Sequence, residues 1–148
     1  MSASKTRWLY TDTSSLPALF TRESGSARAD AFFGHLPKGS KLALSRWTIT
    51  EFHSAIAQKV RSGYLPAEQQ VAVLAHFNAV VEADFECWPV QVADYNEAAM
   101  LTDQFKLKLR AGDALHLAIV KRQQATLVTL DEVQRQAAMH YRIPVLGY

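Results

Sequence analysis

Short apolar runs alternate with longer amphipathic segments along most of the chain. Apolar runs of strand length occupy residues 8–12, 41–44, 85–88 and 126–129, with a further short strand expected at 143–146. Between them, apolar residues recur at helical spacing over residues 14–20, 26–35, 48–63, 66–81, 92–108, 112–123 and 131–140. This alternation predicts an α/β protein: a single three-layer α/β/α domain, residues 1–148, around a mostly parallel sheet of about five strands.

Two of the predicted helices have a marked apolar side. The helix that begins at Pro66 is expected to bury a stripe made of Val71, Leu74, Phe77 and Val81. The helix over residues 92–108 carries on one side Val92, Tyr95, Ala99 and Phe105.

The composition is that of an ordinary soluble globular protein. The chain has 148 residues, of which 49% are hydrophobic and 20% charged, and its formal net charge is +2. The single cysteine, Cys87, excludes an intramolecular disulfide and is expected to be a packed small residue in a reducing compartment. The sequence shows neither a signal peptide nor a run of about 18 apolar residues, so we expect a cytoplasmic protein without a membrane span.

Four carboxylates stand where a predicted strand gives way to a helix. Asp12, Glu51, Asp113 and Asp131 lie in the segments WLYTDTSSL, LALSRWTITEF, LRAGDALHLA and ATLVTLDEV. In a parallel α/β sheet the carboxyl ends of the strands face a common crevice, so acids far apart in sequence can meet there. Acids gathered in this way repel one another unless a cation lies among them, and Mg²⁺ and Mn²⁺ prefer such oxygen ligands. The pattern predicts a metal-dependent enzyme in which a bound ion activates water for phosphodiester cleavage.

Helix capping explains each acid when it is taken alone. Asp12 is a good N-cap residue, Asp113 would lie in a first helical turn, and Asp131 begins a D-x-x-Q pattern. Thr48 and Glu51 have the T-x-x-E spacing of a capping box. Capping does not explain why a charged residue recurs at all four strand-facing positions, and this recurrence favours a shared metal site.

Motifs for other chemistries are absent from the sequence. It contains no G-x-x-x-x-G-K-[ST], G-x-G-x-x-G or G-x-S-x-G motif. A haloacid-dehalogenase-like phosphatase would carry a second aspartate where Ser14 stands. The five histidines lack the spacing of metal ligands, and His116, one turn after Asp113, is expected to form a hydrogen bond rather than bind a metal.

The segments around the acids resemble a known family. In order and spacing, YTDTSSLPALF, LSRWTITEFHSAI, LRAGDALHLAIV and LVTLDEVQRQAA are similar to the PIN-domain nucleases, in particular to the VapC-type ribonuclease toxins of prokaryotic toxin–antitoxin pairs. The resemblance extends from residue 8 to about residue 146. It implies dependence on Mg²⁺ or Mn²⁺, a five-stranded parallel sheet, a homodimer, and a cognate antitoxin whose tail enters the active-site groove.

The resemblance also implies roles for individual residues. Asp12, Glu51 and Asp113 correspond to the first three family acids, and Asp131 to a fourth acid at a more variable position. Three residues occupy positions whose hydroxyls often support the site: Thr13, Ser14 and Thr129. The region between residues 63 and 85 does not identify the antitoxin groove.

Basic residues near the acids in sequence are candidates for contacts with a phosphate backbone: Arg46, Lys106, Lys108, Arg110, Lys121 and Arg122. Arg110 is the first choice for substrate binding, with Arg46, Ser14 and Thr129 as further candidates. Lys121 and Arg122 are expected to lie on a solvated helix face. The expected substrate is RNA cut in an exposed loop, for example of a transfer RNA or a ribosomal RNA.

Two other functions use the same residues. A structure-specific DNA nuclease on this fold would need the same acids, although its larger relatives carry extra DNA-binding elements. A non-catalytic module that binds nucleic acid or a regulatory partner would use the acids only as helix caps. All four acids are present, and this favours an active enzyme.

Overall fold

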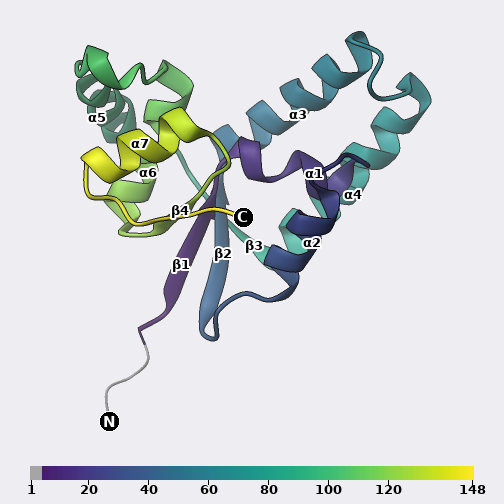
Figure 1. Ribbon diagram of the computed structural model, residues 1–148, viewed down its shortest axis with the longest axis horizontal. Helices are drawn as coiled ribbons and strands as arrows, with labels where there is room; N and C mark the ends of the chain where they lie inside the picture. Colours follow the sequence, from purple (N-terminus) through teal and green to yellow (C-terminus); the bar gives the residue numbers. More distant parts are fainter. Residues whose placement is uncertain (1–4) are drawn as a thin grey trace.

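The structure, a computed structural model, describes residues 5–148. In this part of the chain five strands form one parallel sheet in the order β3-β2-β1-β4-β5 (Figure 1). The strands are β1 Arg7–Thr11, β2 Ser40–Ser45, β3 Phe85–Trp88, β4 Thr126–Val128 and β5 Val145–Leu146. The predicted parallel α/β sheet of about five strands is confirmed, and each strand lies where its apolar run predicts it.

Helices cover both faces of this sheet. Within residues 5–148 they are α1 Pro17–Phe20, α2 Ser26–Gly34, α3 Arg46–Arg61, α4 Gln70–Asp84, α5 Val92–Thr102, α6 Ala111–Gln123 and α7 Glu132–His140. In Figure 1, α1 to α4 lie on one side of the sheet and α5 to α7 on the other. The predicted three-layer arrangement is therefore confirmed. No helix in the described part of the chain is long and apolar enough to cross a lipid bilayer.

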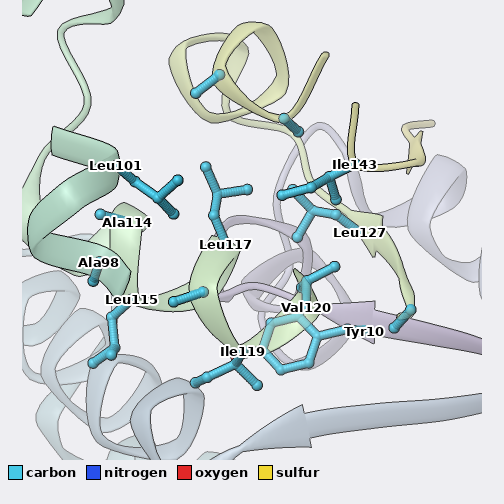
Figure 2. Close-up of a cluster of buried hydrophobic side chains, with 14 of the residues drawn as sticks. Tyr10, Ala98, Leu101, Ala114, Leu115, Leu117, Ile119, Val120, Leu127 and Ile143 are labelled. Atoms are coloured by element: carbon cyan, nitrogen blue, oxygen red, sulfur yellow. The ribbon is translucent and has the colours of Figure 1, made fainter. Parts of the chain in front are cut away.

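Each face of the sheet has its own hydrophobic core, because successive strand side chains point to opposite faces. Ala43 of β2 faces the cluster under α5, α6 and α7, whereas the next residue, Leu44, faces the cluster under α1, α3 and α4. Figure 2 shows the first cluster, in which Val120 of α6 lies beside the ring of Tyr10 from β1. Helix α6 is buried along most of its length, so its position relative to the sheet is tightly fixed.

The predicted helix over residues 92–108 is shorter than the sequence pattern suggested. Helix α5 ends at Thr102 and is followed by a single 3-10 turn, Phe105–Leu107. Lys108 then adopts the left-handed conformation (φ 57°), which a continuous α-helix cannot include. The buried side of α5 is formed by Asp94, Ala98 and Leu101, whereas Tyr95 is exposed. The pattern was misleading because Val92 and Phe105 are also exposed, so those apolar residues do not mark the core side.

Helix α4 buries a shorter stripe than predicted. Phe77 and Val81 are buried, and Phe77 stacks on Phe52 with their ring centroids 3.8 Å apart. Val71, in contrast, is 79% exposed. The reason is visible in Figure 1, where α3 and α4 extend together away from the sheet, so the first turn of α4 has no layer beneath it. Cys87 of β3 packs against this second core, as expected, and burial raises the pKa of its thiol.

The strand order predicts a ligand-binding crevice at the carboxyl end of β1. After β1 the chain builds β2 and β3 on one side, and β4 then returns to the other side of β1. In open α/β sheets ligands bind at such a reversal of strand order, outside the carboxyl ends of the strands. Asp12 follows β1 directly, and its backbone N–H donates to the carbonyl of Val128 in β4 (3.2 Å).

Candidate active site

Asp12 is the most buried of the four predicted acids, with 2% of its surface exposed. Its side chain does not cap the following 3-10 turn. One oxygen accepts a hydrogen bond from Ser14 Oγ (2.7 Å) and the other from Thr129 Oγ1. Burial raises the pKa of Asp12, while His116 and the hydroxyl donors oppose that rise. The capping explanation therefore does not account for this carboxylate, which is held in the crevice by hydroxyl groups.

Glu51 lies in α3 and faces the same crevice from the β2 side. Its Oε1 accepts hydrogen bonds from Thr13 Oγ1 (2.9 Å) and from the imidazole Nε2 of His116. Burial by itself would raise the pKa of Glu51, but the interactions with His116 and Thr13 outweigh burial and lower it. The other oxygen, Oε2, lies near the backbone of Gly112, where an added Cβ would be only 3.3 Å away.

The predicted capping box of Thr48 and Glu51 is wrong. Helix α3 begins at Arg46, and its N-cap is Ser45, which pairs reciprocally with Thr48 at the third helical position. The T-x-x-E pattern was misleading because the helix starts two residues earlier than its first apolar residues indicated. Since the helix is already capped, the Glu51 side chain is free to face the crevice.

Asp113 lies in the first turn of α6, as predicted. Burial first, and then the negative charge of Asp131, raise its pKa to about 6, with smaller contributions from Glu51 and Asp12 and an opposing one from His116. The influence of three other carboxylates on Asp113 shows that the structure brings all four acids into one electrostatic environment.

Asp131 caps helix α7 in this structure. Its Oδ1 caps α7 by accepting a hydrogen bond from the backbone N–H of Gln134 (2.9 Å). The reciprocal half of the D-x-x-Q pattern does not form, because the Gln134 side-chain amide instead donates to the carbonyl of Asp113 (3.2 Å). Asp131 is therefore both a helix cap and a charged neighbour of Asp113.

The hydroxyls of Ser14 and Thr129 connect the loops at the crevice. Ser14 Oγ accepts from the backbone N–H of Leu130 (2.9 Å), and Thr129 Oγ1 accepts from that of Asp131 (3.0 Å). Both hydroxyls also donate to Asp12. The structure thus places these two candidates in contact with the first acid and with the loop after β4.

The basic candidates fall into two groups. Arg46, the first residue of α3, and Arg110, which directly precedes α6, are exposed, as are Lys106 and Lys108. Lys121 pairs with Glu97, and Arg122 forms two hydrogen bonds with the buried carboxylate of Asp94 (2.7 and 3.0 Å). Lys121 is exposed, as expected for a solvated helix face, whereas Arg122 is partly buried and pairs with the buried Asp94 between α6 and α5.

The acids have the chemistry of a site for a hard divalent cation, since all four offer oxygen ligands and the pKa of Asp113 reflects an excess of negative charge. Within residues 5–148, however, no three His, Cys, Asp or Glu side chains meet in an arrangement that could hold a metal ion. Hydroxyl groups hold both oxygens of Asp12, whereas His116 and Thr13 hold one oxygen of Glu51, Oε1. The chemistry of the donor set fits a divalent metal ion.

The sequence did not identify two residues that shape the site. Tyr10, fully buried in β1, hydrogen-bonds His116, and Gly112 allows the close approach of Glu51. His116 was expected to form a hydrogen bond, and it does so with partners distant in sequence. One signal was available: a histidine inside the apolar run ALHLAIV must find polar partners when the helix is buried.

Solved structures with the same fold come from several bacteria. Mycobacterium tuberculosis VapC20, described as a toxin that cleaves the sarcin–ricin loop, is 15% identical, with 87% of this chain and 94% of that chain covered and a TM-score of 0.69. VapBC2 from Rickettsia felis, bound to a DNA fragment from its promoter, is 14% identical, with 95% and 98% covered and a TM-score of 0.65. VapBC-5 from M. tuberculosis, a member of the VapBC family of toxin–antitoxin systems, is 17% identical, with 95% and 96% covered and a TM-score of 0.59.

These likenesses support the fold, since their sequence identities are low. A comparison with curated protein sequences gives no significant match. The PIN domain family model matches residues 9–139, which include all four acids. The chain therefore belongs to the PIN domain family.

Proposed function

We propose that this protein is a metal-dependent endoribonuclease that hydrolyses RNA phosphodiester bonds and acts as the toxin of a toxin–antitoxin pair. The observation that carries the proposal is the shared electrostatic environment of the four acids, in which burial and then the charges of Asp131, Glu51 and Asp12 raise the pKa of Asp113. Membership of the PIN domain family supports a nuclease. Several structures with the same fold are described as toxins or toxin–antitoxin complexes.

Each acid has a distinct role in this proposal. Asp12 and Asp113 would be the principal ligands of Mg²⁺ or Mn²⁺, and Glu51 would complete the shell or orient a water. Asp131 would hold a second, weaker ion or its waters. When bound, the ion would lower the pKa of water and stabilise negative charge on the phosphate oxygens. Ser14 and Thr129 hold Asp12 in place, while Arg110 and Arg46, both exposed, would contact the phosphate backbone.

RNA is the favoured substrate, in particular an exposed loop of a transfer RNA or ribosomal RNA, where bases are unstacked and accessible. The similarity to a toxin described as cleaving the sarcin–ricin loop supports this choice. Sequencing the 5′ ends of RNA fragments after brief expression identifies the target. Cleavage of DNA but not RNA by the purified protein would instead favour the DNA-nuclease alternative.

The proposed protein partners are a second copy of the chain and a small antitoxin. Structures of toxin–antitoxin complexes share this fold, and this supports the second partner. Co-expression with the product of a short neighbouring reading frame should yield a stable complex and suppress cleavage. Light scattering of the purified chain tests the homodimer.

The central test compares RNA cleavage with Mn²⁺ by the wild type, Asp12→Asn and Asp113→Asn. We expect activity to fall by at least about 100-fold in both variants, since losing a metal ligand removes several kcal/mol of transition-state stabilisation. Asp30→Asn is the matched control, because Asp30 is exposed on α2 and should leave activity unchanged. Equal activity of all four proteins would overturn the assignment. Calorimetry with Mn²⁺ tests the capping-only alternative, which predicts no binding that Asp12→Asn abolishes.

A further inference from the structure

A chain of buried hydrogen bonds connects Glu51 to the centre of the sheet. The imidazole of His116, 1% exposed, bonds Glu51 through Nε2 and the hydroxyl of Tyr10 through Nδ1 (2.7 Å). Tyr10, fully buried, in turn contacts Ser45 Oγ (2.8 Å) and Thr48 Oγ1 (3.2 Å). This hydrogen-bond network therefore runs from β1 through α6 to α3, where it ends on Glu51, one of the four acids.

The hydrogen bonds of this network can all run in the same direction, toward Glu51. A carboxylate only accepts, so the Nε2 of His116 must carry the proton that it donates to Glu51. In a neutral imidazole Nδ1 is then an acceptor, and the Tyr10 hydroxyl donates to it. The Tyr10 oxygen can itself accept from Ser45 or Thr48. The Glu51 carboxylate and the Tyr10 hydroxyl thus favour the same imidazole tautomer, with the proton on Nε2.

The rest of the site restricts Glu51 to the same orientation. Thr13 Oγ1 donates to the same carboxylate oxygen as His116 does. On the other side, Gly112 leaves just enough space for Oε2, and Gly112 is held by the indole of Trp47, which donates to its carbonyl (3.1 Å). His116 itself cannot move freely, because α6 is packed into the core around it.

We infer that Tyr10 and His116 are positioning residues that fix the orientation of the Glu51 carboxylate in the metal site. This inference rests on the proposed function, since it assigns Glu51 to the metal or to a metal-bound water. Neither residue touches the substrate or the ion in this assignment. Groups that orient metal-binding side chains through hydrogen bonds typically contribute 10- to 100-fold to metal affinity, roughly the size of effect expected here.

The first test is independent of metal. Two-bond ¹H–¹⁵N NMR spectra of the metal-free wild type should show the His116 side chain as the Nε2–H tautomer. In Tyr10→Phe, which keeps the ring and removes the hydroxyl, the ¹⁵N chemical shift of His116 Nδ1 should change, because Nδ1 loses its hydrogen-bond donor. Finding the Nδ1–H tautomer in the wild type, or an unchanged Nδ1 shift in Tyr10→Phe, would overturn the inference.

The second test measures Mn²⁺ binding by calorimetry. Tyr10→Phe should weaken binding by about 10-fold, at the lower end of the range for such orienting groups. The matched control is Tyr141→Phe, which also removes a tyrosine hydrogen bond, from the Tyr141 hydroxyl to the carbonyl of Leu101 (2.8 Å), but away from the acids. Equal Mn²⁺ affinity of Tyr10→Phe, Tyr141→Phe and the wild type would contradict the assigned role.

The third test replaces the histidine. Glutamine at position 116 offers an amide donor for Glu51 and an amide acceptor for Tyr10, whereas leucine offers neither. His116→Gln should therefore retain more Mn²⁺ affinity than His116→Leu, which a merely space-filling role would not produce. Asp12→Asn separates the proposed function from this inference. If Asp12→Asn binds Mn²⁺ as the wild type does, the proposed metal site is wrong. If only Asp12→Asn loses Mn²⁺ binding, while the variants at positions 10 and 116 keep it, the roles of Tyr10 and His116 alone are contradicted.

Discussion

The fold opposes the ionisation of Asp113. Its pKa rises from the ordinary 3.8 to about 6, first through burial and then through the charge of Asp131. A carboxyl group with a raised pKa in the folded state stabilises the fold while it is protonated. That contribution is complete below pH 3.8 and is lost as the pH rises through 6. Without metal, the ionised site therefore destabilises the protein at neutral pH.

This electrostatic cost predicts a pH-dependent effect of Asp113→Asn on stability in the presence of a chelator. The variant should melt at the same temperature as the wild type near pH 4 and a few degrees higher above pH 6. A change of about 1 kcal/mol in stability shifts the Tm of a domain of this size by roughly 2–4 °C. Solvent screening keeps the electrostatic effect of Asp113 to that modest size. Melting curves from pH 4 to 8 test it, with Asp30→Asn as the control. Wild-type and Asp113→Asn curves that stay parallel over this range would show that the site does not oppose ionisation.

Among the helices, α7 depends on Asp131 in a way that can be separated from any role in metal binding. The Asp131 carboxylate accepts from the backbone N–H of Gln134 and so caps the helix. Asparagine caps helices about as well as aspartate, whereas alanine does not, and loss of such a cap costs about 1 kcal/mol.

Two substitutions therefore distinguish the roles of Asp131. At about pH 5, where Asp113 is largely protonated and little repelled by Asp131, Asp131→Ala should lower the free energy of unfolding by about 1 kcal/mol, and Asp131→Asn should leave it nearly unchanged. If Asp131 also serves the metal, both variants should bind Mn²⁺ more weakly than the wild type. Denaturant unfolding combined with Mn²⁺ titration measures the two effects. Full Mn²⁺ affinity in Asp131→Asn would restrict this residue to its capping role.

For the molecule as a whole, one buried ion pair fixes α6 to α5 and to the end of β3. Arg122, whose side chain is 26% exposed, bonds both oxygens of Asp94, which is 1% exposed. It also donates to the carbonyl of Pro89 (3.3 Å). Removing one partner of a buried pair leaves an uncompensated charge and costs roughly 3–5 kcal/mol.

Arg122→Met should therefore destabilise the protein by about 3 kcal/mol, at the lower end of that range because the pair is partly exposed. Lys121→Met is the matched control. Lys121 pairs with Glu97 but is 52% exposed, and exposed pairs contribute about 0–1 kcal/mol. Urea unfolding of the two variants compares them. A larger effect of Lys121→Met than of Arg122→Met would show that the burial of Asp94 does not govern this contact.

The sequence predicted the architecture well because hydrophobic periodicity depends on local residues. Each strand lies where the pattern placed it, since a run such as ATLVTLDEV carries its own turn and capping signals. Periodicity failed at α5 and in the turn after it, where Tyr95 and Phe105 are apolar but exposed, because a pattern cannot tell which apolar side faces the sheet. It also missed Tyr10, whose partner His116 lies 106 residues away, since such contacts exist only after folding.

The strand order has a consequence for synthesis on the ribosome. Asp12 is made early, but Thr129, which bonds its carboxylate, follows 117 residues later, and β4 joins β1 only after β2 and β3 are complete. Domains fold progressively as they emerge, so a nascent chain can form β1, β2 and β3 before Asp113 and Asp131 join Asp12. Under the proposed function, a growing chain would therefore stay harmless to the ribosomal RNA around it until nearly all of it has been released. Assays of Mn²⁺-dependent cleavage by ribosome-bound chains of increasing length would reveal this delay as a sharp onset once β4 and α7 are free to fold.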